Sequence, residues 1–264
     1  VHPEGAAWQR YGRGLQRRPV IPAAISLLVV LVLAIPLFSL RQGFSDDSGK
    51  AVGSPGRVAF ELMSEGFGAG VNGPFFVAVK LEQPRDMEAY GTIVKGLATA
   101  DGVAGTLPTP AMLPLIAGNP GSFSDDGTVA SIMVVPASAP QDEATTQLLD
   151  RLRTEVDPAL EQATGAGIYV GGAQAITSDF TTVLTEALPI FLLVVVGFGF
   201  LALTLLFHSL VVPLTAAVTS LLSFGAAMGI TVAVFQWGWL AGPLGISGTG
   251  PIMPFLPIMV FAIL

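Results

Sequence analysis

The sequence ALPIFLLVVVGFGFLALTLLF, residues 187–207, decides the class of fold. It contains no charged residue, and no Asp, Glu, Lys or Arg follows it up to Leu264. A charge at the centre of a bilayer costs roughly 2.5–3.5 kcal/mol, so a long charge-free run rich in Leu, Val and Phe is typical of a membrane span. The C-terminal part of the chain is therefore predicted to lie in a membrane.

Further apolar runs lie on both sides of this one. Residues 20–40 carry no charge, and as a helix they span about 31 Å, close to the thickness of a hydrocarbon core. Residues 210–235 form another such run. Residues 251–264 span only about 21 Å as a helix, which is too short to cross a bilayer. We expect three transmembrane helices, a truncated fourth, and a chain that is a fragment of a longer protein.

The N-terminal segment, residues 1–19, contains four arginines and one acidic residue, Glu4. Cytoplasmic flanks of membrane spans are enriched in Lys and Arg, so this segment is predicted to be cytoplasmic and residues 41–186 to lie outside the cytoplasm. A cleaved signal peptide is the competing interpretation. The apolar run exceeds the usual 7–15 residues and no small-x-small cleavage site follows it, which favours a retained span.

Residues 41–186 have the composition of a water-exposed domain and hold 18 of the 19 acidic residues of the chain. An acidic domain lacks the basic face that neutralises phosphates, so nucleic-acid binding is excluded. Alternating and helical apolar patterns predict the order strand–helix–strand–strand–helix–strand, which is the split βαβ, ferredoxin-like α+β arrangement. The strands are expected at 75–82, 103–107, 129–135 and 168–170, and the helices at 86–100 and 142–163.

The sequence offers no catalytic or metal-binding constellation. The chain has no Cys, and its two histidines, His2 and His208, lie in the N-terminal tail and in a membrane turn. A zinc site needs three or four ligands at suitable spacing, and a serine triad needs a His in the outer domain. Adjacent acids such as Asp125 and Asp126 are more typical of solvated turns and caps. We predict no enzyme, no metal and no cofactor.

Several residues of the apolar region are predicted to serve helix packing and membrane placement. Gly225 and Gly229 form a GxxxG pattern, which permits close approach of two helices. His208 and Ser209 form a tight turn between two spans, and Trp237 and Trp239 lie where an interfacial aromatic belt is expected. The prolines of the last apolar run predict a kinked or broken helix, and broken helices in membranes line sites or pathways.

Three stretches of the C-terminal half resemble the MmpL (MMPL) branch of the resistance–nodulation–division transporters. They are FHSLVVPL at 207–214, LLSFGAA at 221–227 and FQWG at 235–238. His208 departs from the Arg that is more usual before this Ser. Shorter matches are Gly66-Phe67-Gly68, Asn72-Gly73-Pro74, Gly171-Gly172-Ala173, Asp179-Phe180 and Pro254-Phe255-Leu256-Pro257.

The resemblance implies part of an exporter driven by the proton-motive force, which moves lipids or other hydrophobic molecules across the bacterial plasma (inner) membrane. It places the chain at the start of the second repeat of such a transporter. It also implies an Asp-Tyr proton relay in the next span, expected just after Leu264, so no relay residue lies in this chain. The implied partners are membrane lipids, a lipid or hydrophobic substrate and the remaining repeat of the same polypeptide.

The outer domain is expected to form part of the substrate path, and the segment from Asp179 to Glu186 to transmit movement between domain and span. There are two alternatives: a non-transporting receptor or scaffold of sterol-sensing-like architecture, and a protein-translocation accessory of the same superfamily.

The predicted parts are a cytoplasmic basic segment (1–19), a transmembrane helix (20–40), an extracytoplasmic porter-like domain (41–186), transmembrane helices (187–207 and 210–235), an extracytoplasmic loop (236–250) and a truncated transmembrane helix (251–264).

Overall fold

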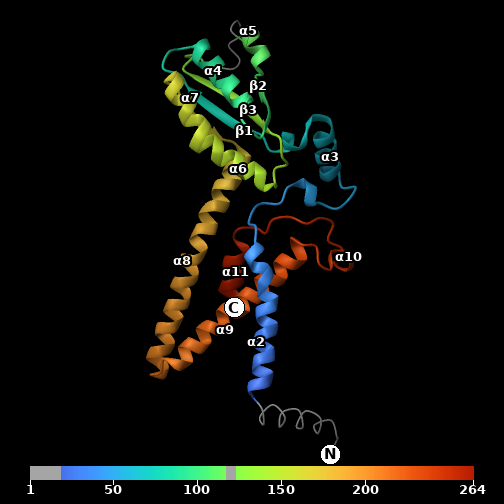
Figure 1. Ribbon diagram of the computed structural model, residues 1–264, viewed down its shortest axis with the longest axis vertical. Coiled ribbons are helices and arrows are strands. Elements are labelled where there is room, and N and C mark those ends of the chain that lie inside the picture. Colours follow the sequence, from blue (N-terminus) through green and yellow to red (C-terminus); the bar gives the residue numbers. More distant parts are fainter. Residues whose placement is uncertain (1–18, 117–122) are drawn as a thin grey trace, which may run out of the picture. The chain divides into compact units, whose positions relative to one another are not determined.

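The computed structural model describes residues 19–116 and 123–264, so the predicted basic segment lies largely outside the described residues. The chain divides into two compact units. The helical unit comprises the described residues up to Arg41 together with Glu186–Ala241 and Phe255–Leu264, and the α/β unit comprises Gln42–Thr185 and Gly242–Pro254. Figure 1 shows the elements of both units coloured along the sequence.

The described residues contain three helices long and apolar enough to cross a membrane, and the apolar parts of all three lie in the helical unit. Helix α2 (Val20–Ala34) continues into a 3₁₀ turn at Ile35–Ser39, α8 covers Ala173–Phe207 and α9 covers Val211–Phe235. Their large apolar side chains are mostly exposed, as for Leu193 (73%) and Phe198 (71%). Such surfaces need lipid or other apolar partners, which agrees with the membrane class predicted from the sequence.

Pro36 and Pro189 lie in or directly after these helices, and only Pro36 accompanies the end of α-helical hydrogen bonding. The α-helical hydrogen bonding of α2 ends at Ala34 and tightens into the 3₁₀ turn that contains Pro36. Pro189 lies inside α8 without ending it. Helix α8 begins at Ala173, well before the span predicted at 187–207, because Gly172 has a φ of +98° and turns the chain directly into the helix from the strand that ends at Gly171.

The α/β unit contains a four-stranded antiparallel sheet in the order β2-β3-β1-β4. The strands are β1 (Phe75–Lys80), β2 (Val103–Leu107), β3 (Val129–Pro136) and β4 (Gly167–Gly171). Helix α4 (Met87–Ala98) connects β1 to β2, and α6 (Glu143–Arg151) and α7 (Asp157–Thr164) connect β3 to β4. The helices cover one face of the sheet, as Figure 1 shows.

Buried and exposed side chains alternate along the strands because helices cover only one face of the sheet. In β1 the side chains of Phe75, Val77 and Val79 are fully buried, while the residues between them face outward. The core beneath α4 includes Tyr90, whose hydroxyl donates to the carbonyl of Ser131 at 3.1 Å. Asp86 caps α4 by accepting from the backbone N–H groups of Glu88 and Ala89.

The second helical connection differs from the single helix predicted at 142–163. A π-helical turn, Leu152–Val156, separates α6 from α7. Pro158 in the first turn of α7 has no N–H with which to bond the carbonyl of Thr154, and this loss accounts for the local change of register. Apolar periodicity did not reveal this turn, because Leu148, Leu152, Val156 and Leu160 recur every four residues, a spacing that also fits one continuous helix.

The last predicted helix is also shorter than expected. Helix α11 covers Leu256–Ile263 only, whereas the prediction began at residue 251. Ile252 instead forms a parallel β-bridge with Gln42, which requires extended backbone. The predicted loop 236–250 contains a short helix, α10 (Ala241–Leu244). The proline-rich segment after β2 contains a 3₁₀ turn (Pro110–Met112) and the short helix α5 (Leu113–Ile116).

Candidate functional site

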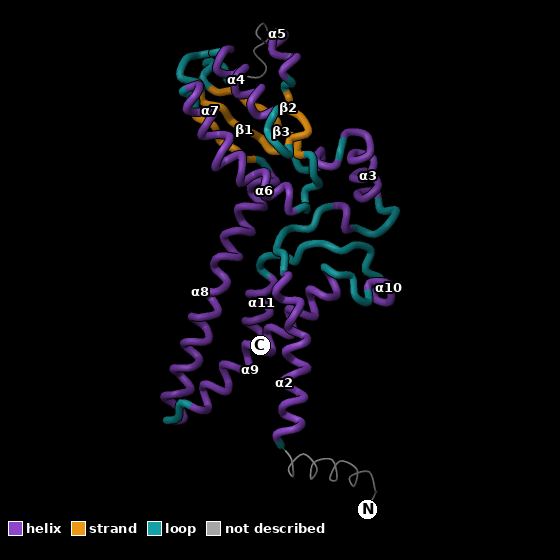
Figure 2. The backbone as a smooth tube through the Cα atoms, in the orientation of Figure 1, coloured by secondary structure: helices purple, strands orange, loops and turns teal. Residues whose placement is uncertain are grey.

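The α/β unit ties together two connecting segments that are about two hundred residues apart in the sequence. We call residues 42–50 and 247–252 the connector pair; both are mostly loop, the class drawn teal in Figure 2, and the first contains a 3₁₀ turn at Asp47–Gly49. The N–H of Gly43 donates to the carbonyl of Ile252 at 3.0 Å, beside the bridge from Ile252 to Gln42. A β-carbon at Gly248 would lie 3.2 Å from the Cα of Gly49, so the two backbones touch there. Glycine is needed for this approach.

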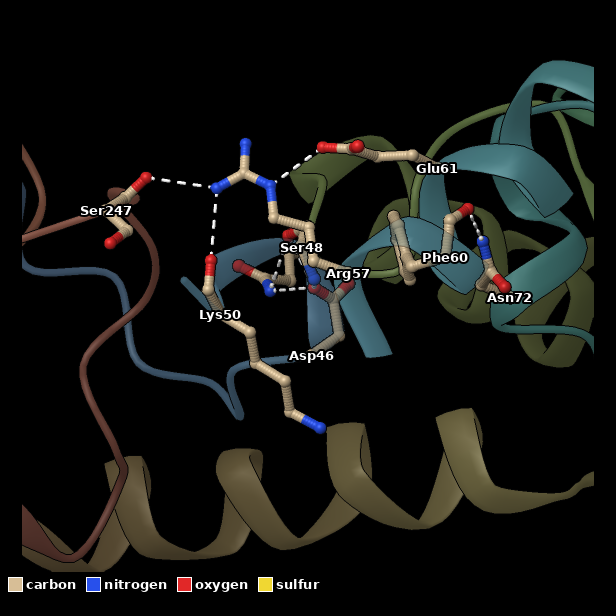
Figure 3. A network of polar contacts seen from close by, with 9 residues as sticks. Asp46, Ser48, Lys50, Arg57, Phe60, Glu61, Asn72 and Ser247 are labelled. Atoms are coloured by element: carbon tan, nitrogen blue, oxygen red, sulfur yellow. Dashed lines mark hydrogen bonds and ion pairs between the residues drawn. The ribbon is translucent and has the colours of Figure 1, made fainter. Parts of the chain in front are cut away.

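Arg57 of helix α3 (Pro55–Phe67) joins the two halves of the connector pair. One guanidinium nitrogen, Nη1, donates to the carbonyl oxygens of Lys50 and Ser247, at 3.1 Å each. The Nε atom donates to Glu61 at 2.7 Å, one turn along the same helix. Figure 3 shows the guanidinium between these three partners. A planar fork of donors suits this task, because it fixes several acceptors at defined angles.

Asp46 anchors the same connector to the remainder of the α/β unit. Its carboxylate accepts from the backbone N–H of Ser48 at 2.9 Å, from the Ser48 hydroxyl, and from the side-chain amide of Gln141. Gln141 lies just before α6, and its Oε1 would be 3.0 Å from a β-carbon at Gly250. The Asp46–Ser48 turn is drawn in Figure 3. The connector pair is therefore bonded on both sides, by α3 and by the segment before α6.

Helices α2 and α9 of the helical unit approach each other at the predicted glycines. A β-carbon at Gly229 would lie 3.0 Å from the Cα of Ala34, with the carbonyl of Leu33 closer still. At Gly225 the nearest atom would be the β-carbon of Ala34, at 3.4 Å, which is ordinary contact. Close backbone approach of this kind is what small residues permit in membrane helices.

The outer end of this helix pair has a polar contact that the sequence analysis missed. The backbone N–H of Arg41 donates to the side-chain oxygen of Gln236 at 3.1 Å, and both residues belong to the helical unit. The ring centroids of Trp237 and Trp239 lie 5.7 Å apart, and both side chains are about half exposed. Their place directly after α9 is the place predicted for interfacial anchors.

The predicted turn at His208 and Ser209 separates α8 from α9. The backbone N–H of His208 donates to the carbonyl of Thr204 at 2.9 Å, and its φ is +48°. This is the left-handed conformation that ends many helices, which glycine adopts most readily. His208 therefore shapes the turn with its backbone.

Asp179, one of the two predicted coupling residues, forms an ion pair. Its carboxylate accepts from both terminal nitrogens of Arg153, with Nη2 to Oδ2 at 3.0 Å. Arg153 also donates to the carbonyl of Val170 at 2.9 Å, so it joins the π turn, β4 and α8. Glu186, the other coupling residue, is the first residue of α8 that belongs to the helical unit. The structure does not bring these two acidic residues together, since they lie two turns apart on one helix.

A cavity of about 260 Å³ lies among α8, α9 and α11 of the helical unit. Phe261 of α11 lines it and also packs edge-on against Phe224, with ring centroids 5.4 Å apart. Ser220 adds a hydroxyl to a wall that is otherwise largely aliphatic. A space of this size and polarity suits part of an acyl chain. Ala217 of α9 also lines it.

Within residues 19–116 and 123–264 no group of three or more His, Asp or Glu side chains is placed to hold a metal ion. The adjacent acids Asp125 and Asp126 lie in a turn. The hydroxyl of Ser124 donates to Asp126 at 2.6 Å, and Thr128 donates through its N–H and its hydroxyl. These hydrogen bonds, that of Ser124 first, lower the pKa of Asp126 to about 2. The carboxylate therefore stabilises a turn.

Comparison with known proteins identifies the protein family. The family model described as MMPL family matches residues 55–262. The chain belongs to the MMPL family. It is 34% identical over 256 residues to membrane protein YdfJ of Bacillus subtilis, an alignment that covers 96% of this chain and 33% of YdfJ.

Two mycobacterial relatives carry functional names. The mycolic acid-containing lipids exporter MmpL11 of Mycolicibacterium smegmatis is 27% identical, over 97% of this chain and 26% of its own length. The trehalose monomycolate exporter MmpL3 of the same organism is 25% identical, over 98% of this chain and 25% of its own length. The chain thus spans between a quarter and a third of these relatives. MMPL membership confirms the predicted family, and these two relatives are named as exporters.

Proposed function

We propose that this chain is part of a transporter that exports lipids or other hydrophobic molecules across the bacterial plasma membrane, driven by the proton-motive force. The observation that carries the proposal is MMPL membership over residues 55–262, together with the names of relatives that export mycolic acid-containing lipids and trehalose monomycolate. The largely aliphatic cavity among α8, α9 and α11 supports it, because it offers an acyl chain an apolar surface at the depth of the apolar helices.

In this proposal the α/β unit is an extracytoplasmic domain of the ferredoxin-like, split βαβ type. The strand order β2-β3-β1-β4, with one helical connection after β1 and another after β3, supports that type. In this orientation the C-terminal end of α2 and the start of the apolar part of α8 lie outside the cytoplasm, and His208 and Ser209 lie at the cytoplasmic face. The basic residues of the N-terminal segment support this orientation.

Helix α8 would transmit movement between the α/β unit and the membrane. It is one uninterrupted helix whose residues up to Thr185 belong to the α/β unit and whose residues from Glu186 belong to the helical unit. Asp179 is held by Arg153, so a change in the α/β unit acts on the first turns of this helix. An uninterrupted helix carries displacement further than a flexible linker does.

Export is tested in bacterial cells that express the complete gene product, with a fluorescent lipid loaded in the inner leaflet. Ala217→Phe fills the cavity and is expected to reduce export several-fold. Ala202→Phe, at an exposed position of α8, serves as the matched control and retains export. A protonophore is expected to abolish export in the parent. Export that survives collapse of the proton gradient would rule out proton coupling, and equal export by the two variants would rule out the cavity as part of the path.

A further inference from the structure

Asp157, the first residue of α7, is a buried carboxyl group without a complete set of partners. Its side chain belongs to the α/β unit and the residue is 4% exposed. The Oδ1 atom is fully buried and has no hydrogen-bond partner. A buried, charged carboxylate without hydrogen-bond partners is strongly disfavoured. Such a group binds a proton and becomes neutral, or it forms an ion pair with a cation.

The cation that could pair with Asp157 is Arg153, which lies four residues earlier, in the π turn. Arg153 and Asp157 line the same pocket of about 230 Å³, together with Glu161 and Tyr169. Residues four apart on a helix can meet through their side chains. Arg153 is nevertheless engaged elsewhere, with Asp179 of α8 at 3.0 Å and with the Val170 carbonyl at 2.9 Å.

The surroundings of Asp157 favour its neutral form. Burial is the main cause that raises the pKa of Asp157 to about 7; the carboxylate of Glu161 adds to the rise and the guanidinium of Arg153 opposes it. On the neighbouring elements, Tyr169 of β4 lines this pocket, and Asp179 of α8 accepts a hydrogen bond from Arg153. Helix α4, whose charged residues are Glu88 and Lys95, packs on α7 through an apolar contact of Gly96 with Leu160. Asp150 of α6 acts on Arg153 as a further negative charge.

We propose that Asp157 and Arg153 form a protonation switch that sets whether the π turn is tied to α8. When Asp157 is neutral, Arg153 binds Asp179 and the Val170 carbonyl, as observed. When Asp157 loses its proton, the buried carboxylate takes the guanidinium of Arg153 within the shared pocket. Asp179 and the carbonyl of Val170 then lose their donor, and the first turns of α8 are released from β4 and from the π turn.

The direction of the effect follows from the linkage between protonation and stability. An unfolded aspartate has a pKa of about 3.9, so between about pH 4 and pH 7 the folded chain retains a proton that the unfolded chain has lost. The stability of the α/β unit therefore falls as the pH rises through this window. The proposal concerns this unit alone and does not rest on what the protein transports.

The test uses the full chain in detergent micelles. Thermal unfolding of the α/β unit is followed by circular dichroism between about pH 5 and pH 8. One linked proton changes the unfolding equilibrium constant about tenfold per pH unit within the window. We expect the melting temperature of the parent to fall as the pH rises, and that of Asp157→Asn to fall much less. Asp125→Asn, an exposed acid in the turn before β3 and outside this pocket, is the matched control and keeps the pH dependence of the parent.

A second measurement separates a switch from a merely buried acid. A double-mutant cycle of Arg153→Gln and Asp179→Asn measures the coupling between these two residues. The coupling is expected to be several-fold stronger near pH 5 than near pH 8 in the parent, and independent of pH in Asp157→Asn. Coupling that is the same at both pH values in the parent would overturn the switch.

A third measurement does not depend on the folding of any variant. The carboxyl carbon signals of isotope-labelled aspartates are followed by nuclear magnetic resonance in the parent chain. The proposal requires one aspartate to titrate near pH 7. Titration of every aspartate below about pH 5 would overturn it.

Discussion

Gly229 of α9 lies against the backbone of α2 so closely that a β-carbon there would stand 3.0 Å from the Cα of Ala34 and nearer still to the carbonyl oxygen of Leu33. The neighbouring atoms are backbone, which cannot turn aside as a flexible side chain can. The helix pair therefore depends on the absence of a side chain at this position.

Gly229→Ala is accordingly expected to destabilise the helical unit. Overpacking of a tight contact costs about 1–3 kcal/mol, which exceeds the gain of about 1 kcal/mol in helix propensity from Gly to Ala. Gly225→Ala is the matched control, because its β-carbon would meet the β-carbon of Ala34 at an ordinary 3.4 Å. Thermal unfolding in detergent measures both variants. Equal melting temperatures for the two variants would contradict the packing role of Gly229.

Arg57→Gln is expected to loosen the connector pair. The change removes the charge-assisted hydrogen bonds to the carbonyl oxygens of Lys50 and Ser247, each worth about 1.5–3 kcal/mol for a charged donor. The segment 242–254 should then be cut faster by a protease added to the purified chain. Glu61→Gln removes only the ion pair between Glu61 and Arg57. The Glu61 side chain is 52% exposed, so this variant is expected to change the rate of digestion little. Identical digestion of the parent and Arg57→Gln would show that Arg57 does not hold the segment.

The sequence was sufficient for the elements that rest on periodicity. Alternation in Phe75, Val77 and Val79 predicted β1, and the charge-free runs predicted the three long apolar helices. These patterns are local, because each strand or helix shows its buried face in its own residues. The resemblance carried by residues 207–238 also predicted the family, whose model matches residues 55–262.

The connector pair and the Asp157 pocket were beyond the reach of the sequence. Arg57 reads as one of several basic residues in an acidic segment, and its partner Ser247 contributes only a backbone carbonyl, which leaves no trace in a sequence. Ile252 looked like the start of a helix, because apolar residues near prolines fit a span as well as an extended bridge. Asp157 falls inside the helix predicted at 142–163, and nothing in its sequence neighbourhood indicates that its carboxyl group is buried. Long-range contacts decide all three, and single-sequence patterns do not contain them.

Ser124→Ala is expected to raise the pKa of Asp126 from about 2 toward its ordinary value near 4, because the Ser124 hydroxyl is the main donor that stabilises the carboxylate. A lowered pKa stabilises the turn above the unfolded pKa of about 4, and this contribution is lost as the pH falls toward 2. The carboxyl signal of Asp126 in a nuclear magnetic resonance titration measures the shift. Ser138→Ala, whose hydroxyl bonds Thr145 instead, is the control and should leave the midpoint unchanged.

The proposed orientation in the membrane predicts which positions a water-soluble reagent reaches from outside the cell. The chain contains no cysteine, so single-cysteine variants need no prior substitutions. We expect Ala137→Cys, at an exposed position after β3, to react with a membrane-impermeant maleimide in intact spheroplasts. Ser209→Cys, in the turn between α8 and α9, should react only after lysis. Leu201→Cys, within the apolar part of α8, is the control and should react poorly in both, because a thiol in an apolar environment forms little thiolate. Labelling of Ser209→Cys in intact spheroplasts would invert the orientation and place the α/β unit in the cytoplasm.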